Sequence, residues 1–146
     1  MKKGLANKVN KYLANVGVSY IKLHNLHWNV VGPQFKAVHE YLESLYDSYA
    51  DVLDEVAEHL KMEGRYPAAS LREYLELADV QELDSKDIRV EEALRVVYDD
   101  MELLKNQASE IREAADKAGD FSLVAMMEDQ IGEYSKQLWF VGSMLK

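Results

Sequence analysis

Residues 39–58 read HEYLESLYDSYADVLDEVAE, a run in which leucine, tyrosine and valine recur at three- and four-residue steps. This period is typical of an amphipathic helix whose apolar face packs on a core. Beside that face the run carries four residues that can bind a metal ion, namely His39, Glu43, Asp54 and Glu58. On a helix that advances about 100° per residue, these four side chains lie within one stripe about 100° wide. The run therefore predicts a long helix with a core face and a neighbouring ligand-bearing face.

The positions of these four residues suggest a metal site shared between two chains. Glu43 and Asp54 are separated by roughly 16 Å along a helix, whereas a transition metal lies only about 2 Å from its ligands. Two antiparallel copies, related by a twofold axis midway between positions 48 and 49, would place His39 beside the partner's Glu58 and Glu43 beside the partner's Asp54. An ordinary solvated acidic face would carry similar residues, so the pattern alone leaves both interpretations open.

The composition favours one all-α domain over residues 1–146. The chain has 48% hydrophobic and 29% charged residues but only two prolines and seven glycines, which suits a globular helical protein with one sizeable core. It has no cysteine, so any metal ion must be bound by histidine and carboxylate. The start, MKKGLANKVNKYL, lacks the apolar run of a signal peptide, and no stretch approaches the ~18 apolar residues of a membrane span. We therefore expect a cytoplasmic protein.

The net charge of −9 is distributed unevenly along the chain. Residues 1–39 hold six lysines and no acidic residue, which leaves a charge of −15 on the remainder. A strongly acidic body attracts cations and repels DNA. Solubility alone would account for the same charge, so the imbalance by itself does not identify a ligand.

Helical periodicity and breaker residues predict five helices. Four long helices are expected at residues 5–30, 35–63, 88–117 and 121–145, and a short one at 68–78. Three of the four breaks contain glycine or proline, and the fourth, residues 79–87, is an acidic connector. Four long helices with a short extra helix in the middle crossover connection correspond to a ferritin-like four-helix bundle.

Two features of these helices have ordinary structural explanations. His27 lies on the apolar stripe of the first helix, where a hydrogen-bonded core histidine is commoner than a metal ligand. Trp139 and the methionines of the last helix are most simply core residues. Neither feature identifies a site by itself.

One set of motifs goes beyond composition and periodicity. It consists of His27-Trp28-Asn29, Gly32-Pro33, Phe35, His39, Glu43 and Asp54-Glu55-x-x-Glu58, then EYLELA in the middle connection, Gly119-Asp120, and Gln137-x-Trp139 in the last helix. This set resembles the Dps family, the mini-ferritins, over essentially the whole chain. The resemblance implies a homo-dodecameric shell, built from twofold dimers, that oxidises ferrous iron and stores the ferric mineral inside. In this family hydrogen peroxide is usually a better oxidant than dioxygen.

The resemblance also implies which residues bind iron. The ferroxidase ligands are His27, His39 and Glu43 from one subunit, with Asp54 and Glu58 of the partner subunit. Glu58 is expected to help bind the first of two iron ions, and Glu43, an aspartate in many relatives, to complete a weaker second position. Such an imidazole–carboxylate set suits ferrous iron and also admits zinc, manganese or cobalt. No Glu-x-x-His occurs in the chain, which disfavours the di-iron site that other ferritin-like proteins build within one bundle.

Three further residues receive roles only through the resemblance. Trp28, next to His27, is expected to relay an electron or trap a radical at the iron site, although packing would also explain it. Asp120 and Asp129 match acidic positions at threefold pores that guide iron inward, although solvated helix-end acids are equally ordinary. The acid that usually lies five residues after Asp120 is Ala125 here, which makes such a pore less acidic.

Two other functions compete with iron oxidation and storage. DNA binding in the family often depends on a long basic tail, but here the first helix is expected to begin by Leu5. A weak basic patch could come from Lys2, Lys3, Lys8 and Lys11, and assembly of the cage would present one copy of it on every subunit. A nucleoid-binding structural cage is therefore the alternative function, and we expect DNA binding to be weak or absent. A helical interaction module without metal is the third possibility, against which the symmetric ligand stripe argues.

Overall fold

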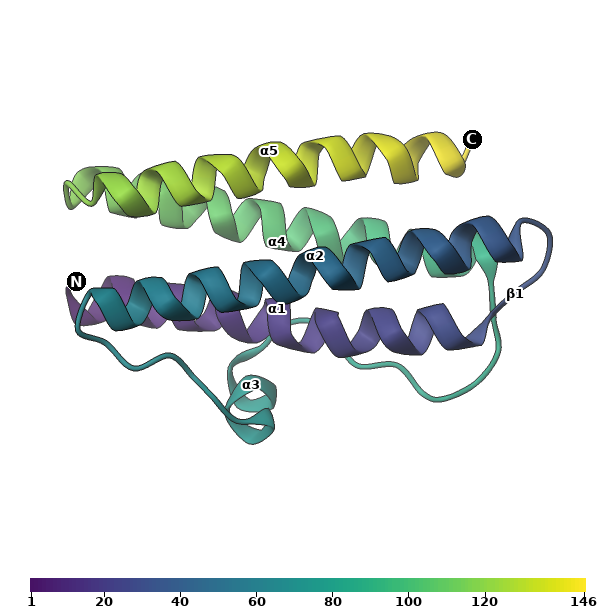
Figure 1. The fold of residues 1–146 in the computed structure, drawn as a ribbon, viewed down its shortest axis with the longest axis horizontal. Helices are drawn as coiled ribbons and strands as arrows, with labels where there is room; N and C mark the ends of the chain where they lie inside the picture. Colours follow the sequence, from purple (N-terminus) through teal and green to yellow (C-terminus); the bar gives the residue numbers. More distant parts are fainter.

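Four long helices run side by side in the computed structural model, which describes residues 1–146 (Figure 1). They are α1 (Lys3–Asn29), α2 (Phe35–Met62), α4 (Val90–Lys117) and α5 (Phe121–Met144), and the short helix α3 (Leu71–Leu77) lies outside the bundle. Because α1 packs along α2 and α4 along α5, the bundle consists of two antiparallel hairpins joined by the long connection that contains α3. The fold predicted from the sequence is confirmed.

One hydrophobic core runs through the bundle. It contains 28 buried residues drawn mainly from the four long helices, and its largest fully buried side chains include Tyr12, Leu42, Leu104 and Met127. These residues belong to the apolar stripes of the sequence, because a helical period turns every third or fourth side chain toward the same face. The core therefore holds the polar stripe of α2 on the outside of the bundle.

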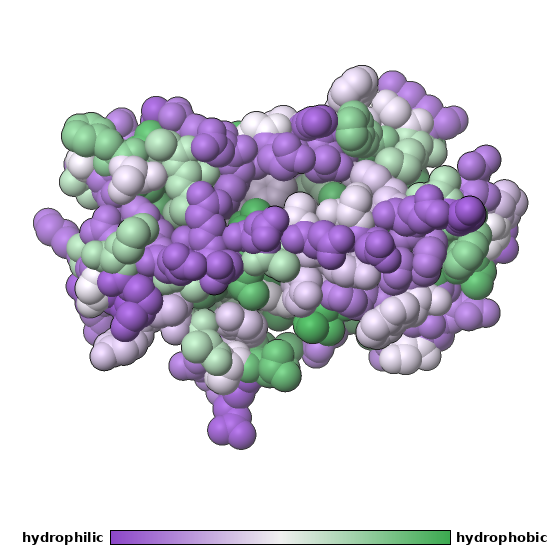
Figure 2. Space-filling model, viewed as in Figure 1, coloured by the Kyte–Doolittle hydropathy of each residue, from purple (hydrophilic) through white to green (hydrophobic).

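Trp139 is not the core residue that the sequence predicts. It is 66% exposed on α5, whereas Val141 is fully buried. Leu138 and Val141, three residues apart, share the inward face of α5, and Trp139 is turned away from Leu138 by about 100°. Figure 2 shows hydrophobic residues scattered over a mostly hydrophilic face. None of the helices combines the length and the apolar composition that a bilayer span needs.

A short parallel ladder joins two connections at one end of the bundle. β1 (Val30–Val31) pairs with β2 (Ile88–Arg89), where the sequence predicts the last residue of one helix and the first residues of another. The structure ends α1 at Asn29 and begins α4 at Val90, within two residues of the limits predicted at about 30 and about 88. Two residues are too few to show a strand period, so the pairing depends on tertiary contacts that the sequence pattern does not reveal.

The short helix α3 begins later than the sequence predicts, at Leu71 rather than at residue 68. The Ser70 hydroxyl oxygen accepts a hydrogen bond from the Glu73 backbone N–H at 3.2 Å, and the Glu73 carboxylate accepts one from the Ala69 N–H at 2.7 Å. This reciprocal arrangement resembles a capping box, which fixes the start of a helix. The helix therefore begins after Ser70, where Ser70 and Glu73 cap it, and not directly after Pro67 as the sequence predicts.

The turn between α1 and α2 brings two histidines together. Gly32 has a φ of 116° and Gln34 a φ of 71°. Gly32 suits this position because it lacks a Cβ atom, which would lie only 3.1 Å from the Arg89 guanidinium carbon. The chain thus reverses between the end of α1 and the start of α2, so that His27 faces His39.

Candidate metal centre

His27 and His39 form a paired imidazole unit at the α1–α2 turn. Their rings stack with 3.7 Å between centroids and 11° between planes. The Nδ1 atom of His27 lies 2.6 Å from the His39 carbonyl oxygen, and the Nδ1 atom of His39 lies 2.7 Å from the His27 carbonyl oxygen. Because a carbonyl oxygen only accepts, each Nδ1 donates. Because Nδ1 is engaged, Nε2 is the nitrogen of each ring that can bind a metal ion, and the hydrogen bond fixes the orientation of the ring.

Glu43 lies one turn along α2 from His39 and adds a carboxylate to this pair. Its Oε1 atom is 3.7 Å from His27 Nε2, and its side chain is 56% exposed. The Tyr46 hydroxyl donates to the same carboxylate oxygen at 3.4 Å. Desolvation, together with the charge of Glu43, raises the pKa of Tyr46, which keeps its hydroxyl protonated. The start of α2 thus gathers two imidazole nitrogens and one carboxylate.

Asp54 and Glu58 lie one turn apart farther along α2, and both are exposed. A hydrogen bond with Asp54 and the like charge of that residue raise the pKa of Glu58. A proton shared between two adjacent carboxylates, or a cation bound to both, removes the electrostatic repulsion between them. The structure does not bring this pair to His27 and His39 of the same chain. The predicted ligands form two half-sites, one from α1 and the start of α2 and the other farther along α2. That a dimer joins the two half-sites stays a prediction.

Trp28 is 68% exposed, and other rings lie between it and the paired histidines. Its indole lies 5.6 Å from the His24 ring, which stacks on Tyr46 at 3.7 Å. Tyr46 meets the His27 ring edge-on at 5.4 Å. Sequence reasoning missed Tyr46 and gave His24 no role, although His24 and Trp28 share a helix face at four-residue spacing. The relay role of Trp28 stays a prediction, now with a defined aromatic path.

The two predicted pore residues have different surroundings. Asp120 precedes α5 and caps it, because its Oδ1 atom accepts from the Leu123 N–H at 3.1 Å. Asp129 is exposed on α5. A threefold pore needs further subunits, so the role of both residues stays a prediction.

The chain matches a known family over almost its whole length. The family model for the ferritin-like domain matches residues 6–146. The chain is 36% identical to antigen TpF1 of Treponema pallidum over 142 residues, which cover 97% of this chain and 80% of that protein. It is 30% identical to the DNA protection during starvation protein of Helicobacter pylori over 132 residues, 90% of this chain and 92% of the other.

Solved structures agree with these sequence matches. The crystal structure of antigen TpF1 matches with a TM-score of 0.96 at 36% identity, and the match covers 98% of this chain and 92% of that one. The Dps protein of Vibrio cholerae O1, described as a member of a broad superfamily of ferritin-like diiron-carboxylate proteins, matches with a TM-score of 0.94 at 31% identity over 99% and 90% of the two chains. Sequence and fold thus agree along the whole bundle. The chain belongs to the ferritin-like family and, within it, to the Dps proteins.

Proposed function

We propose that this chain is the subunit of an iron-storage and detoxification cage that oxidises ferrous iron, with hydrogen peroxide as the preferred oxidant. The oxidation sites lie between twofold-related subunits. The observation that carries the proposal is the crossed hydrogen bonding of His27 and His39, which leaves both Nε2 atoms available, with that of His27 beside Glu43. A histidine whose other nitrogen donates to a carbonyl oxygen is typical of a metal ligand.

The acidic half-site complements the imidazole half-site. Asp54 and Glu58 repel each other in the free chain, since the charge of Asp54 raises the pKa of Glu58. A ferrous ion bound between them relieves this repulsion. We therefore assign the first ferrous ion to Glu58 and Asp54 with the partner's His27 and the partner's His39. The second, weaker position involves Glu43.

The proposed donor set suits oxidation of the bound iron. Imidazole and carboxylate bind ferrous iron, and the harder carboxylate oxygens favour the ferric product. Five ligands for two ions leave positions open for water and oxidant. Two ferrous ions give one electron each to one hydrogen peroxide, whose O–O bond breaks and whose oxygens leave as water or enter the mineral. Because both electrons go to the same peroxide, no hydroxyl radical is released.

The assembly and its surroundings are proposed on family grounds. The 146 residues act as one domain of a homo-dodecamer in the cytoplasm, with ferric mineral inside the shell. Asp120 and Asp129 line the threefold pores, and Trp28 intercepts oxidising equivalents near the iron. The name of the Helicobacter pylori relative refers to DNA protection, but the acidic body of this chain disfavours direct DNA binding.

Anaerobic loading with ferrous iron, followed by a pulse of hydrogen peroxide, tests the proposed function. The absorbance of ferric iron should rise quickly in the wild-type protein and at least about tenfold more slowly in Glu58→Ala, because the first iron ion loses a ligand. Glu76→Gln is the control, since it removes an exposed carboxylate from α3. Equal rates in wild type and Glu58→Ala would show that the assigned site is wrong.

A further inference from the structure

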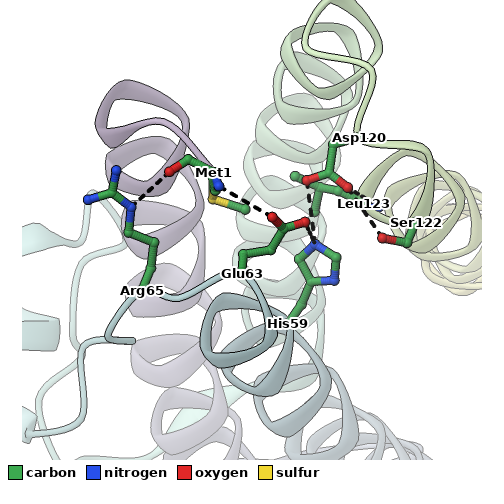
Figure 3. Close-up of polar contacts among 7 residues, drawn as sticks. All are labelled: Met1, His59, Glu63, Arg65, Asp120, Ser122 and Leu123. Carbon is green, nitrogen blue, oxygen red and sulfur yellow. Dashed lines mark hydrogen bonds and ion pairs between the residues drawn. The ribbon is translucent and has the colours of Figure 1, made fainter.

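A second group of metal-ligand side chains lies where α2 ends and α5 begins (Figure 3). His59 belongs to the last turn of α2, Glu63 follows that helix directly, and Asp120 precedes α5. One ligand atom from each residue can be chosen so that all three atoms lie within 4.8 Å of one another. None of these residues is among the proposed iron ligands.

His59 lacks the hydrogen bond that a buried nitrogen normally makes. The residue is 4% exposed, and its Nε2 atom has no hydrogen-bond partner. This atom faces Glu63 Oε1 at 3.4 Å and Asp120 Oδ2 at 3.7 Å. A buried nitrogen that faces two carboxylates without bonding to either calls for another partner.

A metal ion matches these separations. Zinc lies about 2.0–2.1 Å from an imidazole nitrogen and about 2.0–2.2 Å from a carboxylate oxygen, so two of its tetrahedral ligand atoms lie about 3.4 Å apart. The distances from His59 Nε2 to Glu63 and Asp120 are 3.4 Å and 3.7 Å. The two separations from His59 Nε2 therefore nearly match those between ligands of one ion, and all three ligand atoms lie within 4.8 Å of one another.

In each of the two carboxylates, one oxygen accepts hydrogen bonds from other groups of the protein and the other oxygen faces His59. Glu63 Oε2 accepts from the Met1 ammonium group at 3.3 Å. Asp120 Oδ1 accepts from the Leu123 N–H at 3.1 Å and from the Ser122 hydroxyl at 3.3 Å. The remaining oxygens, Glu63 Oε1 and Asp120 Oδ2, are those that face the imidazole, as Figure 3 shows.

The two carboxylates connect the buried nitrogen with solvent. The side chains of Glu63 and Asp120 are 26% and 12% exposed, and both residues line an open depression on the surface. Burial tends to raise the pKa of Asp120, but its contacts with Glu63, Leu123 and His59 lower the pKa overall. Asp120 is therefore ionised at neutral pH, and an ion can reach it from outside.

We propose that His59, Glu63 and Asp120 bind one divalent transition-metal ion, of the zinc or cobalt kind, at a site separate from the iron oxidation site. Three protein ligands leave one position for water. Glu58 precedes His59 but is exposed, because successive side chains of a helix diverge by about 100°. The bound ion joins the end of α2 to the start of α5 and so ties one helical hairpin to the other.

Cobalt titration of the assembled protein tests this site. The background is His27→Ala with His39→Ala, Asp54→Asn and Glu58→Gln, which removes four of the five proposed iron ligands. The probe is Co²⁺ alone, read by its visible absorption. One equivalent per chain should still bind, and this binding should be lost in both His59→Gln and Glu63→Gln. Glu63→Gln guards against a folding defect, because Glu63 is only partly buried. Glu113→Gln, an exposed acid of α4, is the control and should keep the full equivalent.

Crystals soaked in zinc locate the ion. Anomalous scattering should show a peak about 2.1 Å from His59 Nε2 in the wild-type protein, and no peak there in Glu63→Gln. Absence of the peak in the wild type, or full cobalt binding in both variants, would overturn the proposal. In that case the three side chains form only a polar cluster between α2 and α5.

Discussion

His27, His39 and His59 differ in how the fold engages their rings. The Nδ1 atoms of His27 and His39 each donate to a carbonyl oxygen, whereas His59 has a buried Nε2 atom without a hydrogen-bond partner. The sequence predicts the first two as ligands through their spacing and the Dps resemblance. It cannot predict their protonation, because the acceptors are backbone atoms that only the α1–α2 turn brings close. It also misses His59, whose neighbour Asp120 is distant in sequence and was given only a pore role.

Replacing Glu58 with glutamine should stabilise the metal-free protein at neutral pH. The folded-state pKa of Glu58 is raised by Asp54, so the repulsion is absent at low pH and develops as the pH rises through that pKa. Glu58→Gln cannot ionise and escapes this penalty. Thermal unfolding should show a higher Tm than the wild type at pH 7, with the difference vanishing in acid. A constant difference at every pH would exclude the repulsion as its cause.

Replacing Trp28 with phenylalanine should separate iron oxidation from radical capture. The oxidation rate should change little, because Trp28 is exposed and its ring contacts His24 rather than the proposed iron ligands. Spin-trapped radicals should increase, since phenylalanine is harder to oxidise than tryptophan. Trp139→Phe removes another exposed indole and should leave the radical yield unchanged. Equal radical yields in wild type and Trp28→Phe would contradict the relay.

The helices were predictable because their apolar period repeats over many turns, whereas their ends depend on single contacts. Ser70 and Glu73 set the start of α3 through a capping arrangement. The pairing of β1 with β2 shortens α1 and α4 without any local period. Trp139 was misplaced because Leu138 and Val141 take the inward face of α5. Such contacts come from tertiary structure, which the pattern of one segment does not contain.

Helix α3 packs closely on α1 at Gly17, so we expect that adding a single methyl group at this position disturbs α3. A Cβ atom at Gly17 would lie 2.7 Å from the Tyr74 ring of α3. Gly17→Ala should therefore displace α3 and speed amide hydrogen exchange across Leu71–Leu77, although alanine favours a helix by about 1 kcal/mol. Gly4→Ala meets nothing within 4 Å, so it should leave exchange in α3 unchanged. Unchanged exchange in Gly17→Ala would show that α3 does not depend on this contact.

At the scale of the whole molecule, one chain holds two incomplete iron sites rather than one complete site. Its imidazole half-site and its acidic half-site lie at different points along α2, with Glu43 and Asp54 roughly 16 Å apart along the helix axis. The numerical symmetry of these positions predicts that a twofold axis completes both sites at once. Because each proposed site needs residues from two subunits, the most direct measurement combines two different variant chains in one cage.

Co-assembly of two inactive variants makes that measurement. One chain carries His27→Ala and His39→Ala, the other Asp54→Asn and Glu58→Gln, and the two are co-expressed in equal amounts. If each site is shared across a twofold axis, the mixed cages should oxidise iron with peroxide at about a quarter of the wild-type rate, since half of random dimers are mixed and each has one complete site. Mixed cages no more active than either parent would contradict a shared site.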